Sequence, residues 1–147
     1  MRGVAVIMSF VMTEQEREEF LAEVHVGVLA VARDGAGPLA VPVWYRYEPG
    51  GDVQIWMERR SRKYRAIEQA GRLSLVAQTE SSPYKYVSVE GPVVWTERPT
   101  RDEAVAITSR YASREQAEAY VDSELGPDSV LVRMRPEKWL SNDQSKK

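Results

Sequence analysis

The chain of 147 residues contains no cysteine and only one histidine, His25. Without thiols it can form no disulfide, no thiolate zinc site and no cysteine nucleophile. A single histidine also excludes a histidine-rich metal site and leaves one candidate for a histidine base. Because His25 stands alone just before a predicted strand, we expect it to be an ordinary structural or surface residue.

The chain also lacks a long apolar run and a strong excess of charge of one sign. The N-terminal stretch MRGVAVIMSFVM is too short to span a bilayer and has no small-residue cleavage site. We expect residues 1–12 to form an extra strand or a leader segment. The net charge of −2 argues against a polyanion-binding surface. We therefore expect a cytoplasmic protein with no nucleic-acid partner and no membrane partner.

Nothing in the composition divides the chain into parts. Hydrophobic residues make up 43% and charged residues 29% of the sequence, as is usual for a soluble globular domain. There is no internal repeat, no low-complexity segment and no linker-like shift in composition. We predict a single domain over residues 1–147, with a disordered polar tail at 141–147.

The periodicity of apolar residues predicts mostly short strands joined by turns. The first helix begins at a capping box, Thr13 to Glu16. The predicted helices cover residues 13–24, 61–70, 100–111 and 113–125, and the predicted strands cover 26–32, 38–47, 53–58, 72–78, 84–95 and 129–135. Gly91 and Pro92 inside a strand suggest a bulge or an edge. Closely spaced antiparallel hairpins favour a mainly β fold, a small barrel with flanking helices.

Positive charge is concentrated in one place, RRSRKYR at residues 59–65, where a strand gives way to a helix. A helix N-terminus carries unpaired backbone N–H groups and the positive end of the helix dipole. Ser61, Arg62 and Lys63 at this point make an anion site, most naturally for a phosphate. The alternative is a solvated basic helix start. Since the rest of the chain is mildly acidic, a small anionic ligand is favoured over nucleic acid.

Three stretches, PVWYRYEPGGDVQIWM, SRKYRAIEQAGRLSLV and YKYVSVEGPVVW, together resemble a known family. They are similar to the pyridoxamine 5′-phosphate oxidase-like FMN-binding split-barrel superfamily, including its flavin- and deazaflavin-dependent oxidoreductases. The resemblance is best over residues 14–97. It implies an antiparallel split β-barrel that binds FMN or coenzyme F-420, with cofactor sites at a homodimer interface.

The resemblance also implies a set of cofactor-binding residues from five segments. The helix start grips the phosphate, the strand before it lines the flavin, and an earlier strand fixes the ring edge. A later strand contributes a polar side chain, and a C-terminal tryptophan lies beside the cofactor of the partner subunit. The corresponding residues here are Val43, Trp44, Trp56, Met57, Ser61, Arg62, Lys63, Lys85, Tyr86 and Trp139.

The sequence departs from the true oxidases because no histidine follows His25, so their C-terminal arginine–histidine pair has no counterpart. The implied function is therefore an oxidoreductase that passes hydride between FMN or coenzyme F-420 and a small organic substrate. The cofactor carries this chemistry, so no general acid or base and no metal ligand is assigned. One alternative is a non-catalytic flavin- or anion-binding carrier or sensor. Another is a nucleic-acid-binding barrel that stacks bases on Tyr84 and Tyr86.

Overall fold

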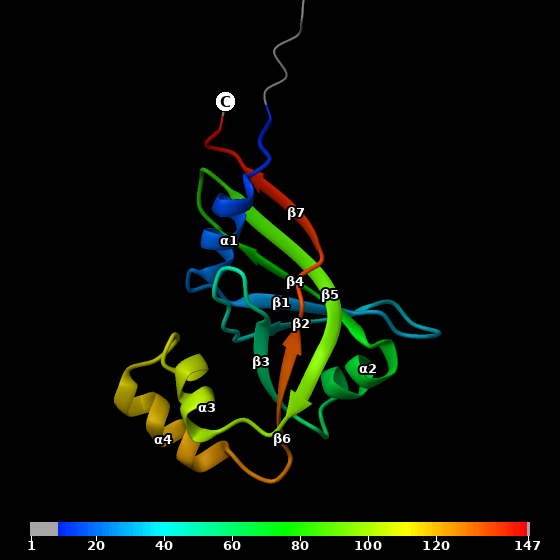
Figure 1. Ribbon diagram of the computed structural model, residues 1–147, viewed down its shortest axis with the longest axis vertical. Helices are drawn as coiled ribbons and strands as arrows, with labels where there is room; N and C mark the ends of the chain where they lie inside the picture. Colours follow the sequence, from blue (N-terminus) through cyan, green and yellow to red (C-terminus); the bar gives the residue numbers. More distant parts are fainter. Residues whose placement is uncertain (1–8, 147) are drawn as a thin grey trace, which may run out of the picture.

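The computed structural model describes residues 9–146, which form seven strands and four helices (Figure 1). The predicted extra strand or leader at 1–12 lies largely outside the described residues. In chain order the elements are α1 (Glu14–Ala22), β1 (Gly27–Val31), β2 (Leu39–Val43), β3 (Val53–Glu58), α2 (Arg62–Ala70), β4 (Arg72–Gln78), β5 (Lys85–Glu97), α3 (Arg101–Thr108), α4 (Arg114–Glu124), β6 (Ser129–Met134) and β7 (Lys138–Asp143).

The strands form one curled antiparallel sheet in the order β2-β1-β4-β5-β6-β3, with β7 also paired to β5. This arrangement confirms the predicted mainly β, split-barrel fold. The long strand β5 joins the two halves of the sheet, since it pairs with β4 and β7 through its first part and with β6 through its second. Figure 1 shows β5 running through the length of the molecule between these neighbours.

Strand β2 is shorter than the predicted 38–47, because the chain leaves β1 after Val43 and turns toward the other half of the sheet. Arg46 and Gln54 exchange two backbone hydrogen bonds of 2.9 and 2.8 Å, which link this segment to β3. Tyr45 and Tyr47 keep their side chains buried on either side of this bridge. The crossing segment therefore brings the end of β2 beside β3.

The irregularity predicted at Gly91 and Pro92 has a specific cause. Both residues stay paired with β4, and the register shift falls later, between Val93 and Trp95. A Cβ atom at Gly91 would lie 1.7 Å from the carbonyl oxygen of Arg135. Glycine is therefore required where the chain from β6 to β7 crosses β5, because any side chain would collide with the backbone.

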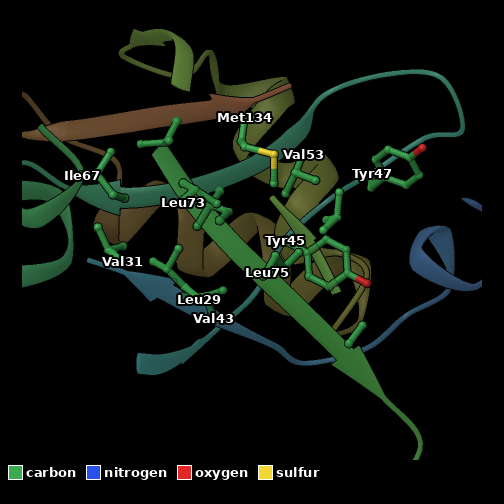
Figure 2. Packing of buried hydrophobic residues seen from close by; sticks show 14 of the residues in the cluster. Leu29, Val31, Val43, Tyr45, Tyr47, Val53, Ile67, Leu73, Leu75 and Met134 are labelled. Carbon is green, nitrogen blue, oxygen red and sulfur yellow. The ribbon is translucent and has the colours of Figure 1, made fainter. Parts of the chain in front are cut away.

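The main core lies between the inward faces of the two half-sheets and α2 (Figure 2). Alternate strand residues point inward, among them Leu29, Val31, Leu75 and Met134, and α2 contributes Ile67. Full burial of one such side chain stabilises the fold by about 1.5–3 kcal/mol. Helix α2 is held in place by the Ser61 N-cap, and Gly71 ends it in the left-handed conformation, with φ of 70°.

The C-terminal segment differs from the expectation of disorder, because residues 141–143 belong to strand β7. The side chains of Ser141 and Asp143 are buried, and the Met12 backbone N–H donates to the Ser141 hydroxyl over 3.1 Å. The free edge of β5 supplies the backbone partners for this strand. A polar sequence gave no sign of this pairing, since the order comes from hydrogen bonds to β5 rather than from apolar burial.

Helices α3 and α4 pack against each other through a small apolar cluster of Ala104, Val105 and Val121, separate from the main core. Two residues after α3 fix this helical pair to the barrel. The Arg110 guanidinium donates to the carbonyls of Ala22 and Glu23. The Tyr111 hydroxyl donates to the His25 carbonyl over 2.6 Å. In the part of the chain that is described, no helix has the length and apolarity needed to cross a bilayer.

Candidate functional site

A pocket of about 330 Å³ lies where the ends of β2 and β3, the start of α2 and the pair α3–α4 meet. Its volume falls in the range of small-molecule sites, about 300–1,000 Å³. The residues that line it are Pro42, Val43, Trp44, Trp56, Met57, Glu58, Ser61, Lys63, Ile107, Thr108, Tyr120 and Glu124. Six of the ten residues proposed from the sequence are therefore brought together at one place, from β2, β3 and the α2 start.

Strand alternation explains how β2 and β3 line the pocket. Val43 and Met57 are buried in the core, so each presents only part of its surface to the pocket. Trp44 directly follows Val43, and Trp56 directly precedes Met57. Because neighbouring strand residues alternate between faces, both tryptophans point to the opposite face of the sheet. Trp44 is 40% exposed. Two large aromatic surfaces thus stand on neighbouring segments, on the side of the sheet that the pocket occupies.

Tyrosines from the helical pair complete an aromatic cluster with these tryptophans. The ring of Trp44 stacks on that of Tyr111, with centroids 4.9 Å apart and planes 5° from parallel. Tyr120 lies 6.2 Å from Trp44 and 5.9 Å edge-on from Trp56. The indole N–H of Trp56 is buried and has no hydrogen-bond acceptor in the described residues. An unsatisfied buried donor is costly, so a ligand acceptor at this atom would be stabilising.

The start of α2 supplies the positive end of the pocket. Its first turn reads Arg62-Lys63-Tyr64, with no carboxylate to offset the helix dipole. Lys63 lines the pocket and takes part in no ion pair within residues 9–146. The Ser61 hydroxyl caps the helix by accepting from the Tyr64 N–H, and it donates to the Glu58 carbonyl over 2.6 Å. Ser61 therefore shapes the helix start, and Lys63 supplies the charge.

Arg62 does not line this pocket although it lies between two residues that do. Consecutive residues of a helix point about 100° apart, so Arg62 faces the other flank of α2. There it lines a separate hollow with Arg33 and Arg65. The run of basic residues that the sequence treats as one group is thus divided between two surfaces.

Lys85, Tyr86 and Trp139 lie away from the pocket within a single chain. Lys85 and Tyr86 are at the start of β5, paired with Asp143 and Asn142 of β7. The Lys85 ammonium is 4.0 Å from an Asp143 carboxylate oxygen. The Trp139 ring packs under the Arg17 guanidinium at 4.7 Å and lies edge-on to Tyr47 at 6.1 Å. Within one chain, therefore, none of these three side chains lines the pocket.

The sequence interpretation missed the contribution of α3 and α4 to the pocket. Ile107, Thr108 and Tyr120 lie on apolar helix faces, which helical spacing indicates only as packing surfaces. Thr108 is buried, and its hydroxyl donates to the Ala104 carbonyl over 2.9 Å. Its methyl group is therefore the part of the side chain left to contact a ligand. Tyr120 is 48% exposed, and it carries a phenol that can contact a ligand. No local signal in the sequence marks which helix face meets the sheet.

The charges around the pocket are mixed rather than uniformly basic. Glu58 and Glu124 line it together with Lys63, and the Ser129 hydroxyl donates to a Glu58 carboxylate oxygen over 3.1 Å. Burial, and to a lesser extent the neighbouring Tyr111, raises the pKa of Tyr45. The Tyr45 hydroxyl donates to the Leu21 carbonyl over 2.6 Å. Tyr45 therefore remains a protonated structural donor. Among the residues described, no group of three or more metal-ligating side chains gathers.

Fold and pocket together define a split-barrel protein with an aromatic, partly cationic ligand site. A model of the pyridoxamine 5′-phosphate oxidase family matches residues 13–143, and the chain belongs to this family. No curated protein sequence gives a significant match.

Solved structures share the fold at low sequence identity. The conserved hypothetical protein Rv2991 from Mycobacterium tuberculosis has a TM-score of 0.77 at 20% identity, over 98% of this chain and 91% of that one. A protein named F420 reductase has a TM-score of 0.66 at 22% identity, over 84% and 94% of the two chains. General stress protein 26 from Bacillus anthracis has a TM-score of 0.63 at 16% identity, over 88% and 92%. At these identities the likeness establishes the fold alone.

Proposed function

We propose that the protein is an oxidoreductase that binds FMN or coenzyme F-420 in the pocket between β2, β3, α2 and α3–α4. One observation carries this proposal. Two tryptophan faces line the same pocket as Lys63 and the start of α2, whose first turn holds no carboxylate. A planar ring that carries a phosphate matches these two features at once, because aromatic side chains bind flat apolar surfaces and helix starts bind phosphate.

The chain's residues would divide the work of holding the cofactor. Lys63 and the first N–H groups of α2 would bind the phosphate, while Trp44 and Trp56 would flank the ring system. The buried Trp56 N–H, which has no acceptor in the described residues, would donate to a ring or ribityl oxygen. Tyr120 would cover the pocket from the helical side and exclude water. The bound cofactor would supply the hydride chemistry itself.

The substrate is expected to differ from pyridoxamine phosphate. No histidine follows His25 in the chain, and the His25 ring packs on Phe20 with centroids 4.4 Å apart. His25 is not among the residues that line the pocket. The positive charge at the pocket is that of Lys63, which the cofactor phosphate would neutralise. A small organic substrate without a phosphate group of its own therefore suits the site better.

We further propose that two chains form a homodimer, with the cofactor sites at the interface. The outer face of β1, β2 and β4 carries an apolar hollow that includes Val26, Val28, Pro42 and Val76. Val26 is 54% exposed and Val28 is 39% exposed. Contiguous exposed apolar surface commonly marks a protein interface. Pro42 lines both this hollow and the pocket, so a second chain here could bring Lys85, Tyr86 or Trp139 toward the cofactor.

Parallel titrations of the purified protein with FMN and with coenzyme F-420, followed by absorbance and tryptophan fluorescence, test the proposal. Quenching by one cofactor at micromolar concentration supports the assigned pocket, because Trp44 and Trp56 line it. Reduction of the bound cofactor with dithionite and its reoxidation by small test acceptors then separates an enzyme from a carrier. Failure of both cofactors to bind contradicts the proposed function, and binding without turnover of any acceptor favours the carrier or sensor alternative.

A further inference from the structure

A hollow of about 310 Å³ lies beside α1, where three separate segments of the chain meet. Helix α1 contributes Arg17, the turn before β3 contributes Asp52, and the connection from β6 to β7 contributes Arg135. The hollow lies at the opposite end of β3 from the tryptophan-lined pocket, since Asp52 directly precedes the strand whereas Glu58 ends it and lines that pocket. We call it the α1 hollow. Its size is at the lower end of the range for small-molecule sites.

Arg17 is held in the α1 hollow by a ring and not by a carboxylate. Its guanidinium lies over the Trp139 ring, 4.7 Å from the centroid. Glu14 is three residues earlier on the same helix and also lines the hollow, yet the two side chains form no ion pair. The Arg17 Nε–H is buried and finds no acceptor among residues 9–146. Stacking on the indole fixes the plane of the guanidinium and leaves its terminal N–H groups for a ligand.

Arg135 supplies a second guanidinium to the same hollow. It is exposed just after β6, and it forms no ion pair within the part of the chain that the structure describes. Other arginines, such as Arg72 and Arg101, do have carboxylate partners. Two guanidinium groups at one hollow match a ligand carboxylate, because each can donate a pair of parallel N–H bonds to it.

The α1 hollow also carries negative charge that the protein leaves unpaired. Of the three carboxylates that line it among the described residues, Glu18 is engaged. It accepts from the Tyr47 hydroxyl over 3.0 Å and from the Gly50 N–H over 2.8 Å. Glu14 and Asp52 form no ion pair in residues 9–146. Charges of both signs therefore share one hollow without pairing with each other.

We propose that the α1 hollow binds a zwitterionic small molecule of the α-amino acid type. The ligand carboxylate binds Arg17 and Arg135, the ammonium group binds Glu14 and Asp52, and an apolar side chain lies near Trp139. A simple anion would meet the carboxylates and a simple cation would meet the arginines, so either alone is a poorer match. The site lies apart from the tryptophan-lined pocket, and the inference does not depend on the proposed function.

Calorimetric titrations with related probes test the inference on the protein without added cofactor. The zwitterions are L-phenylalanine and L-alanine. L-phenylalaninol lacks the carboxylate, and 3-phenylpropanoate lacks the ammonium group. We expect one of the two zwitterions to bind with a Kd of about 1 mM or below. If it is phenylalanine, the two single-charge analogues should bind at least about tenfold more weakly, since each loses one set of charged hydrogen bonds. Absence of saturable binding of both zwitterions would overturn the inference.

Variants then locate the binding. Arg135→Gln should weaken binding of the zwitterion at least about tenfold and leave binding of L-phenylalaninol unchanged. Glu14→Gln/Asp52→Asn should weaken binding of the zwitterion and leave binding of 3-phenylpropanoate unchanged. Arg114→Gln, at an exposed arginine of α4 that does not line the hollow, is the matched control and should bind as wild type does. Circular dichroism confirms that each variant is folded. Wild-type affinity in folded Arg135→Gln, or an equal loss in the control, would show that the zwitterion does not bind in the α1 hollow.

Discussion

Trp44 and Tyr111 stack face to face, with ring centroids 4.9 Å apart and planes within 5° of parallel. The stack joins the end of β2 to the turn between α3 and α4. The same tyrosine hydroxyl donates to the His25 carbonyl and accepts from the Tyr45 N–H over 3.1 Å. Trp44 is thus positioned by a side chain that is itself held by the barrel backbone, which makes one wall of the pocket rigid.

Removal of the Tyr111 hydroxyl should lower the stability of the fold. In Tyr111→Phe the stack with Trp44 remains, while the His25 carbonyl and the Tyr45 N–H lose their partner. Because such part-buried groups cost about 1–3 kcal/mol when left unsatisfied, we expect a loss of that size in the free energy of unfolding. Urea denaturation followed by circular dichroism measures it. Tyr84→Phe, at a 56% exposed tyrosine, is the control and should leave stability unchanged; equal stability of both variants would contradict the prediction.

Lys63 and Arg62 should contribute unequally to the binding of FMN. Lys63 lines the pocket and Arg62 does not. A hydrogen bond to a charged group contributes about 1.5–3 kcal/mol, so Lys63→Gln should weaken binding by about 10–100-fold. Arg62→Gln should change it less than threefold. Fluorescence quenching provides the measurement, with Lys138→Gln on the exposed face of β7 as the control. A folded Lys63→Gln protein with unchanged affinity for FMN would remove Lys63 from the phosphate site.

Tyr120 should affect ligand binding without affecting the fold. It is half exposed, and its ring lies against both pocket tryptophans. An aromatic contact is worth about 0.5–1.5 kcal/mol beyond its buried area, so Tyr120→Ala should weaken cofactor binding by about 2–10-fold. Tyr120→Phe should bind as wild type does. Loss of binding in both variants would instead indicate that the phenol hydroxyl, and not the ring, contacts the ligand.

Glu16 should make the fold sensitive to acid. Hydrogen bonds from Lys146, and then from the Thr13 backbone, lower the pKa of Glu16 from 4.5 to about 2. A carboxyl group with a lowered pKa in the folded state stabilises it fully above the unfolded value, and this contribution is lost as the pH falls from about 4.5 to about 2. Carboxyl NMR should show Glu16 titrating near the lower end of this range.

The partner of Glu16 can be removed for comparison. Lys146→Met should raise the pKa of Glu16 part of the way to 4.5, because the Thr13 N–H still donates to the carboxylate. Glu16→Gln keeps the capping box, since glutamine also accepts at this position, and it should lose less stability than wild type between pH 4.5 and pH 2. A Glu16 titration near 4.5 in wild type would show that the Lys146 contact does not persist in solution.

The proposed dimer should depend on the apolar outer face of the sheet. Val28 is exposed on β1 and lines the hollow with Val26 and Val76. A glutamate in its place would put an unpaired charge into the interface, so Val28→Glu should sediment as a monomer where wild type sediments as a dimer. Val11→Glu, at another exposed valine that does not line the hollow, is the matched control. A monomeric wild-type protein would contradict the dimer directly.

Local sequence signals were sufficient for most of the fold. The predicted strand at residues 72–78 matches β4 residue for residue, and the capping box at Thr13 occurs as predicted. These features depend on neighbours within a few positions. Strand β7 was missed because its order depends on the edge of β5, some fifty residues earlier in the chain, and its last three residues, Ser141 to Asp143, are polar.

The candidate site could be predicted only where short segments converge. Val43, Trp44, Trp56, Met57, Ser61 and Lys63 come from β2, β3 and the helix that directly follows, and they line one pocket. The contribution of α3 and α4 to the pocket was not foreseen. An apolar face in a helix sequence indicates that the helix packs, but not which part of the protein it packs against. The division between Lys63 and Arg62 was also not foreseen, because it follows from the rotation of α2 about its axis and not from the composition of the basic run.

The long strand β5 has a consequence for how the domain loses its structure. It pairs with β4 as far as Pro92, with β7 as far as Glu90 and with β6 from Val93 onward, so one continuous strand belongs to both halves of the sheet. Detaching either half means breaking pairs along the same strand that holds the other half. Opening of the barrel is therefore a single cooperative event, and the slowest-exchanging backbone amides of β4, β5 and β6 should share one free energy of opening.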